Sequence, residues 1–206
     1  MKTVNVSLVG VGGQGTLLTS DLLAKTAARA GCDVKKSEIH GMAQRGGSVI
    51  SQVRFGASVA SPIIQEGTSD LLVSFDKLEA LRWAHLLCAG GRAVVADTYL
   101  VPVTVSSGQQ PEVEGLDERL RQALPGAVVI DAAHIAAEQV GNERTTNMVL
   151  AGALSTLTPF PPDDWKETMR ESFTGSKARL LDLNIKAFEL GRAAAASAAA
   201  AANGNG

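Results

Sequence analysis

A strand, a glycine-rich turn and a helix follow one another at the start of this chain. Residues 4–9 form an apolar, β-branched run, Gly10-Val11-Gly12-Gly13-Gln14-Gly15 follows directly, and residues 16–30 carry leucines at helical spacing before Gly31. A short apolar run ended by glycine is typical of a buried parallel strand. Glycines then let the chain turn sharply into a helix whose first amides stay open to a ligand. The segment therefore constrains the chain to a fold that begins with a strand–helix unit.

Strand and helix patterns alternate along the rest of the chain. We expect strands at residues 32–37, 48–55, 71–75, 93–96 and 128–130, with residues 57–64 pairing with 48–55 and residues 101–105 extended at a sheet edge. We expect helices at residues 78–87, closed by Gly90-Gly91, and at 116–124, 132–140, 147–157, 163–173 and 177–192. Because apolar and polar side chains alternate over 48–55, that strand is predicted to be half-exposed.

This order of elements predicts an α/β fold: a Rossmann-like, mostly parallel sheet with helices on both faces and a C-terminal helical extension. We assign residues 1–192 to a single domain and residues 193–206 to an alanine-rich tail that could extend the last helix. Gly10, Ser74, Asp97 and Asp131 lie at or near the ends of four expected strands. Ligands of such sheets bind beyond the carboxyl ends of the strands, so we expect the binding site there.

Composition and charge exclude several classes of protein. The net charge is -2 and no basic stripe is present, which argues against nucleic-acid binding. No apolar run is long enough for a membrane span, and Met1 leads into a strand without a signal peptide, so we expect a cytoplasmic protein. The two cysteines, Cys32 and Cys88, lack the spacing of a zinc or iron–sulfur site, and we expect no metal bound by this chain.

The first glycine loop is a candidate ligand site at Gly10, Gly12, Gly13, Gln14 and Gly15. Three of its glycines fit the dinucleotide fingerprint, whose backbone amides approach a pyrophosphate. That fingerprint also requires an acidic residue about twenty positions further on. Lys35 and Lys36 stand there, flanked by Asp33 and Glu38. Simple NAD binding is therefore disfavoured, and two readings stay open: a purely structural tight turn, or a site for another anion such as the coenzyme A pyrophosphate.

The second glycine loop follows thirty residues later, as Ile39-His40-Gly41-Met42-Ala43-Gln44-Arg45-Gly46-Gly47-Ser48-Val49. His40 could donate a proton or act as a structural polar anchor, and Arg45 could bind a carboxylate or phosphate. Gln44 and Ser48 add hydrogen-bonding groups, and Gly46 and Gly47 expose backbone. Such a loop is costly to order unless a ligand or a partner uses it.

Together the two loops resemble the gamma subunit or gamma domain of the 2-oxoacid:ferredoxin oxidoreductases, and most closely the small (beta) subunit of the indolepyruvate enzymes. Residues 69–82, Asn147-Met148-Val149-Leu150-Ala151-Gly152-Ala153-Leu154 and 184–191 resemble further segments of that family. Asp76 departs from the pattern, because glutamate is expected there. The resemblance covers nearly the whole chain except the alanine tail.

The resemblance implies one subunit of an enzyme that oxidatively decarboxylates a 2-oxoacid with coenzyme A to an acyl-CoA, carbon dioxide and reduced ferredoxin. The family's thiamine diphosphate and [4Fe–4S] clusters belong to other subunits or domains, here a large catalytic (alpha) subunit. The two loops would close over that subunit's active site and help to bind coenzyme A or substrate. No residue of this chain is assigned as catalytic, and we expect the isolated chain to be inactive.

Two rival functions remain at this point. One is a free-standing nucleotide- or coenzyme A-binding module without catalysis, which rests on the same first loop. The other is an NAD-dependent dehydrogenase, which the missing acid and the lack of a separate substrate domain disfavour. The 2-oxoacid, a homodimer and the roles of individual loop residues are left open by the sequence.

Overall fold

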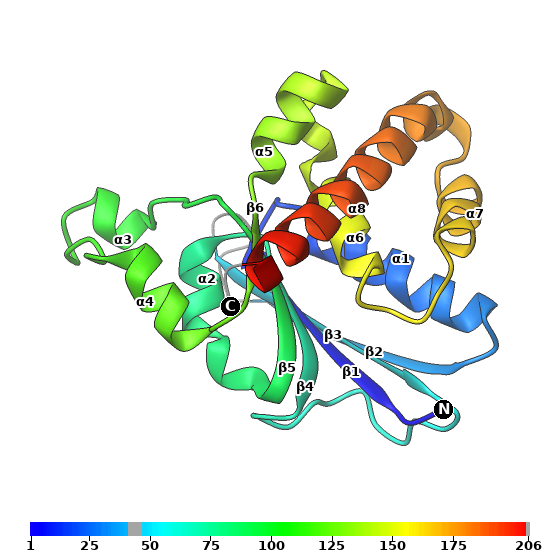
Figure 1. Ribbon diagram of the computed structural model, residues 1–206, viewed down its shortest axis with the longest axis horizontal. Coiled ribbons are helices and arrows are strands. Elements are labelled where there is room, and N and C mark those ends of the chain that lie inside the picture. The colour runs from blue at the N-terminus through cyan, green and yellow to red at the C-terminus, as the bar shows by residue number, and fades with distance from the viewer. Residues whose placement is uncertain (41–46, 205–206) are drawn as a thin grey trace.

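Six strands form a single sheet in the computed structural model, which describes residues 1–40 and 47–204, and the side chains of 1–39 and 47–200 (Figure 1). The strands are β1 (Val4–Val11), β2 (Asp33–His40), β3 (Ser48–Gly56), β4 (Ser69–Ser74), β5 (Leu87–Ala96) and β6 (Val128–Ile130). Their order across the sheet is β2-β3-β1-β4-β5-β6. The predicted α/β class is confirmed.

The sheet is mostly parallel, with one reversed strand. β1, β4, β5 and β6 run parallel to one another. β3 runs antiparallel to β1, with Val4 opposite Phe55 and Val11 opposite Ser48, and it is also antiparallel to β2. β2 therefore points the same way as β1, but β3 separates the two.

The helices between and after the strands are α1 (Thr16–Arg29), α2 (Lys77–Arg82), α3 (Val103–Ser106), α4 (Leu116–Ala123), α5 (Ala132–His134), α6 (Thr146–Ser155), α7 (Pro162–Ser172) and α8 (Leu181–Gly204). Short 3-10 turns lie at Ala84–Leu86, Glu143–Thr145 and Gly175–Leu180, and a π-helical turn at Ile135–Val140. No helix within residues 1–40 and 47–204 has both the length and the apolar sequence that a bilayer crossing requires.

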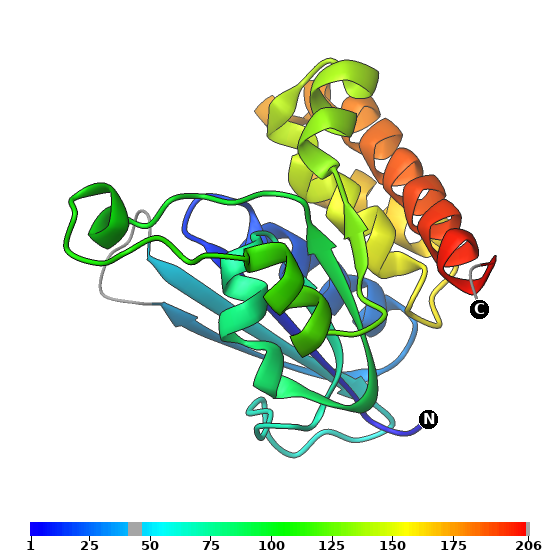
Figure 2. The same ribbon diagram turned by 60° about the vertical axis from the view of Figure 1, so that its left-hand side comes forward.

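Helices cover both faces of the sheet, as the alternation predicts. The larger core cluster joins one face, with Leu8 and Val53, to helices that include α1, α6 and α8. The smaller cluster joins the other face, with Val9 and Leu72, to α2 and α4. Leu8 and Val9 belong to different clusters because successive strand residues point to opposite faces. Figures 1 and 2 show α6, α7 and α8 gathered together, away from α2, α3 and α4.

The C-terminal helices α6 and α8 touch through glycines. A Cβ atom on Gly152 would lie 2.0 Å from the carbonyl oxygen of Phe188, and one on Gly191 would lie 1.9 Å from that of Val149. Only glycine permits backbones to approach this closely. α8 continues through the predicted tail to Gly204, and Ala195 within that tail is buried in the core.

Several local predictions were wrong, and each has a physical reason. Residues 57–64 form no strand; Arg54 and Gln52 hold this segment through its backbone, with Arg54 Nη1 donating to Ser61 O at 2.7 Å and Ile64 N donating to Gln52 Oε1 at 3.1 Å. β3 is not half-exposed, because both of its faces are largely buried.

The other corrections concern helix and strand ends. Gly90-Gly91 lies inside β5 and does not close a helix, since α2 ends at Arg82. Residues 101–105 are not an extended edge strand, because the short helix α3 begins at Val103, directly after its N-cap residue Pro102. Proline is well suited to the residues around a helix start, since its fixed φ fits there.

Candidate functional site

The first glycine loop and the described ends of the second, His40 and Gly47, lie at one edge of the sheet. The parallel strands β1, β4, β5 and β6 all end at this edge, and the antiparallel strand β3 begins there. Gly12 N donates a hydrogen bond to Gly47 O at 2.9 Å. The first loop is thus joined to the end of the second at the carboxyl ends of the parallel strands.

Internal contacts of Gln14 and Gly10 fix the conformation of the first loop. Gln14 Oε1 accepts a hydrogen bond from Val11 N at 2.7 Å, and Gln14 Nε2 donates to Phe75 O at 2.9 Å. A Cβ on Gly10 would lie 2.9 Å from both Gln14 Oε1 and Phe75 Cβ. Both ends of the Gln14 amide are therefore engaged in fixing the turn to the end of β4.

Gly13 and Gly15 provide the open part of the first loop. Their φ angles are +103° and +90°, which side-chain-bearing residues rarely adopt. A Cβ on Gly13 would meet nothing within 4 Å, so this peptide faces open space. Gly15 caps α1 and offers no side-chain hydrogen bond to the first amides of that helix. Those amides and the helix dipole favour an anion at this point.

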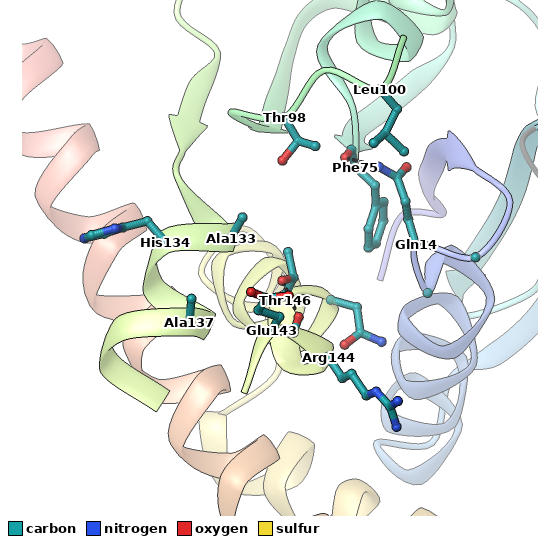
Figure 3. Close-up of a pocket in the computed structure, with 13 residues that line it drawn as sticks. Gln14, Phe75, Thr98, Leu100, Ala133, His134, Ala137, Glu143, Arg144 and Thr146 are labelled. Carbon is teal, nitrogen blue, oxygen red and sulfur yellow. Dashed lines mark hydrogen bonds between the residues drawn. The ribbon is translucent and has the colours of Figure 1, made fainter. Parts of the chain in front are cut away.

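A cleft of about 570 Å³ opens beside Gly13 and Gly15. It is lined by Gly13, Gln14, Gly15, Phe75, Thr98, Leu100, Ala133, His134, Ala137, Glu143, Arg144, Thr146 and Asn147. Figure 3 shows Gln14, Phe75 and Leu100 on one side, Ala133, Ala137, Glu143 and Thr146 on the other, and His134 pointing away from both. The walls come from the segments that follow β1, β4 and β5, from α5 and the π-helical turn after it, and from the 3-10 turn and the start of α6.

Asn147 is the one strongly buried polar side chain in this lining. It is 9% exposed, and its Oδ1 atom has no hydrogen-bond partner among the described residues. It packs against the first loop so closely that a Cβ on Gly15 would lie 2.4 Å from Asn147 Nδ2. The buried Thr16 hydroxyl likewise has no hydrogen-bond partner among the described residues. Unpaired buried polar groups are rare, and a bound ligand would satisfy them.

The sequence did not assign Asn147, Arg144 or Thr98 to the site. Asn147 could have been found, because it is the one polar side chain in the otherwise apolar or small run 147–154. Arg144 and Glu143 bring opposite charges to the cleft, so neither sign dominates there. No sequence signal distinguishes Thr98 from other loop threonines.

The acids at the strand ends have structural partners. Asp76 Oδ1 accepts from Leu78 N and Glu79 N in the first turn of α2, while Asp131 caps α5 through His134 N. Asp97 pairs with Lys77 at 2.8 Å, and Asp117 pairs with the same ammonium at 3.0 Å. Hydrogen bonding to Asp97, and then to Asp117, raises the pKa of Lys77 above its ordinary value.

The second loop is described only at its ends. The backbone of His40 closes β2, while the His40 side chain and the whole of Gln44, Arg45 and Gly46 lie outside the described residues. Gly47 accepts from Gly12, as above. Ser48 starts β3, and its hydroxyl donates to Glu79 Oε2 at 2.5 Å.

The second strand does not offer the acid of a dinucleotide fold. β3 lies between β1 and β2, so the end of β2 is one strand further from the first loop than in that fold. Lys36 pairs with Asp21 and Glu38, and Lys35 pairs with Asp33. Burial lowers the pKa of Lys36, but its hydrogen bonds to the two carboxylates outweigh this and raise it overall.

The donor set of the described residues does not fit a metal ion or an iron–sulfur cluster. Within residues 1–39 and 47–200, no three His, Cys, Asp or Glu side chains are placed to hold a metal. Cys32 and Cys88 are half-buried free thiols. An iron–sulfur cluster needs several thiolates at one place.

Residues 5–194 match the family described as pyruvate ferredoxin/flavodoxin oxidoreductase, and the chain belongs to that family. The chain is 40% identical to indolepyruvate oxidoreductase subunit IorB of Thermococcus kodakarensis, over 95% of this chain and 97% of that protein. The resemblance seen in the two loops is confirmed.

Two solved structures have the same fold. The gamma subunit of a keto/oxoacid ferredoxin oxidoreductase from Geobacter sulfurreducens has a TM-score of 0.70 at 21% identity, covering 94% of this chain and 99% of that one. The 2-oxoglutarate:ferredoxin oxidoreductase of Magnetococcus marinus, with 2-oxoglutarate, coenzyme A and succinyl-CoA bound, has a TM-score of 0.71 at 24% identity. It matches 96% of this chain but 32% of its own length, so there the fold is part of a longer polypeptide.

Proposed function

We propose that this chain is the small subunit of an indolepyruvate-type 2-oxoacid:ferredoxin oxidoreductase. Such an enzyme oxidatively decarboxylates a 2-oxoacid with coenzyme A, yielding an acyl-CoA and carbon dioxide while ferredoxin accepts the electrons. The observation that carries the proposal is the similarity to an indolepyruvate oxidoreductase subunit over nearly the full length of both proteins. We place the complex in the cytoplasm.

In this proposal a large catalytic (alpha) subunit holds thiamine diphosphate and the [4Fe–4S] clusters. When bound there, these groups supply the chemistry of decarboxylation and electron transfer to ferredoxin. The donor set of the small chain supports this division, because two half-buried thiols cannot ligate a four-iron cluster. The contribution of the small chain is then to bind, orient and exclude water.

The cleft beside the first loop is proposed to bind the phosphate-bearing part of coenzyme A. Two features support this: the uncapped start of α1 at Gly15 and the open peptide at Gly13. A phosphate there would accept from backbone amides at the positive end of the helix dipole. The unpaired Oδ1 of Asn147 is an acceptor, so it would bond to a hydroxyl or amide N–H of coenzyme A and not to phosphate. Gly10 and Gly12 would hold the loop in shape, and Gln14, which also lines the cleft, would hold it through its bonds to Val11 and Phe75.

The second loop is proposed to line the junction with the large subunit. Arg45 would offer positive charge to a carboxylate or phosphate, and His40 and Gln44 would offer hydrogen bonds. Gly46 and Gly47 would let the backbone approach the partner. The Ser48 hydroxyl is already bonded to Glu79, so its contribution would come through the position of β3.

The first test is reconstitution. The chain alone and the chain co-purified with its large subunit are assayed with indolepyruvate, coenzyme A and ferredoxin. We expect turnover from the complex and none from the isolated chain. Substantial turnover without a second subunit would refute the proposal.

The second test targets Asn147. The variant Asn147→Ala should raise the KM for coenzyme A in the complex by about twofold to tenfold, because a hydrogen bond from a neutral donor of coenzyme A to Oδ1 contributes about 0.5–1.5 kcal/mol. The matched control is Asn184→Ala, since Asn184 of α8 is also buried but its Nδ2 donates to the oxygen of Leu180, the residue directly before α8. The control should lower stability while leaving the KM unchanged.

A free-standing coenzyme A- or nucleotide-binding module remains the second candidate. The same cleft would serve it, since nothing in its geometry requires a second subunit. Titration calorimetry of the isolated chain with NAD, NADP and coenzyme A separates the two candidates. Tight binding to the lone chain favours the module, whereas binding only in the complex favours a site completed by the partner.

A further inference from the structure

A buried carboxylate sits in the first turn of α2, outside the cleft described above. Glu79 is 3% exposed and accepts hydrogen bonds on both oxygens. Arg82 Nη1 donates to Oε1 at 2.7 Å, and Trp83 Nε1 donates to Oε2 at 3.1 Å. Ser48 Oγ donates to Oε2 at 2.5 Å. Three donors thus satisfy and orient the carboxylate.

The three donors differ in origin. Arg82 and Trp83 are three and four residues further along the same helical segment, so they set the direction of the carboxylate locally. Ser48 is the first residue of β3 and lies on a different element. Trp83 Nε1 also donates to Ser48 Oγ at 3.1 Å, which closes the network. The bond that leaves α2 is therefore directed at the start of β3.

The start of β3 in turn fixes the first loop. Gly47, the residue before Ser48, accepts the hydrogen bond from Gly12 N. Ser48 is also paired with Val11, the last residue of β1. A continuous path therefore runs from Glu79 through Ser48 and Gly47 to Gly12, and it joins α2 to both glycine loops.

We propose that Glu79 is a positioning residue that sets the two glycine loops in register with each other. A buried carboxylate is unfavourable on its own, and an apolar side chain would fill the same volume without desolvation. What the carboxylate adds is a fixed direction for the Ser48 hydroxyl. Loss of the network should loosen the Gly12–Gly47 bond while the sheet remains intact.

The Gly12 amide provides a direct test on the isolated, folded chain. Hydrogen exchange followed by NMR should show protection of the Gly12 amide falling by about tenfold in Ser48→Ala, because local opening then becomes easier. Glu79→Gln should do the same, and Ser48→Thr, which keeps the hydroxyl, should restore protection. If Glu79→Gln does not fold, the two Ser48 variants still decide the matter.

Ser7→Ala is the matched control. Ser7 is fully buried in β1, and its hydroxyl bonds to that of Ser69 at 2.7 Å, away from both loops. It should lower global stability about as much as Ser48→Ala but leave Gly12 protection within about twofold of wild type. Equal changes at Gly12 in both variants, or none in Ser48→Ala, would overturn the proposal.

The catalytic consequence rests on the proposed function. In the assembled complex, Ser48→Ala and Glu79→Gln should raise the KM for coenzyme A more than they lower kcat, since the loop would bind less well before any chemical step. An inactive wild-type complex would count against the proposed function, and the exchange measurement would still decide the role of Glu79. An active complex with unaltered KM in both variants would refute the positioning role in catalysis.

Discussion

Gly191 of α8 lies in backbone contact with Val149 of α6. A methyl group added at Gly191 would stand 1.9 Å from the Val149 carbonyl oxygen, and this obstacle cannot rotate away. The crossing of the two helices is therefore set by main-chain atoms. Because Asn147 lies one turn or less from this contact, the crossing also fixes one wall of the cleft.

Gly191→Ala should destabilise the fold by about 2 kcal/mol. Overpacking costs about 1–3 kcal/mol, and the better helix propensity of alanine offsets about 1 kcal/mol. Because the clash is with backbone, we expect a cost at the upper end. Urea unfolding followed by far-ultraviolet circular dichroism measures it. Ser197→Ala, at an exposed position of α8, is the control and should not destabilise. A stabilised Gly191→Ala would show that the helices separate freely.

The contact between Gly15 and Asn147 can be isolated by comparing two glycines of one loop. Gly13→Ala should cost about 1–3 kcal/mol from its positive φ alone, since it faces open space. Gly15→Ala should cost clearly more, because the new methyl group would also meet Asn147. Thermal unfolding of the two variants gives the difference. Equal losses would mean that Asn147 moves aside at no cost.

Ser51→Ala should stabilise the protein by about 1 kcal/mol. The Ser51 side chain is fully buried in β3, and its hydroxyl has no partner among the described residues. An unsatisfied buried hydroxyl costs about 1–3 kcal/mol. Ser7→Ala removes a hydroxyl that is hydrogen-bonded, so this variant should be destabilised. Denaturant titration compares them, and a destabilised Ser51→Ala would reveal a partner for that hydroxyl.

The pairing of Lys77 with Asp97 and Asp117 should appear as a pH dependence of stability. Because folding raises the pKa of Lys77, its contribution is fully present below the ordinary lysine value of 10.5 and is lost as pH rises through the raised pKa. The stability difference between wild type and Lys77→Met should therefore be constant near neutral pH and shrink above 10.5. Urea unfolding across this range measures it. Asp97→Asn should remove the larger part of the same pH dependence. If the stability difference between wild type and Lys77→Met persists at high pH, the effect of Lys77 comes from packing and not from its charge.

Arg45→Ala should lower turnover of the assembled complex by about tenfold or more, if its guanidinium makes a charge-assisted hydrogen bond to ligand or partner. The melting temperature of the isolated chain should not change. Arg121→Ala is the control, because Arg121 is an exposed arginine that pairs with Glu118 in α4. A melting temperature that falls in step with activity would mark Arg45 as structural.

The strand–loop–helix start, the α/β class and most element positions could be predicted from the sequence. Local apolar runs and glycines encode them directly. The antiparallel direction of β3 could not be predicted, because it depends on which strand pairs with β1. Its alternation of polar and apolar residues suggested exposure, yet Gln52 is buried and bonds to Ile64 across a loop.

The candidate site was only half visible in the sequence. The first loop can be recognised in the sequence by its glycines, whereas Asn147 contacts it from a helix more than a hundred residues further along the chain. Gln14 was predicted as a ligand residue because it lies within the first loop, whose backbone offers donors. Its side-chain amide ties the loop to Phe75, and this use of the side chain could not be predicted before the strands are placed.

The antiparallel pairing of β2 with β3, in which His40 lies opposite Val49, makes the second glycine segment the connection of a hairpin. Since β3 is buried on both faces, a slip of one residue would exchange its two sets of side chains. Insertions and deletions within β3 itself should therefore be far less tolerated than substitutions. A change of one residue there would turn every later side chain of the strand to the opposite face.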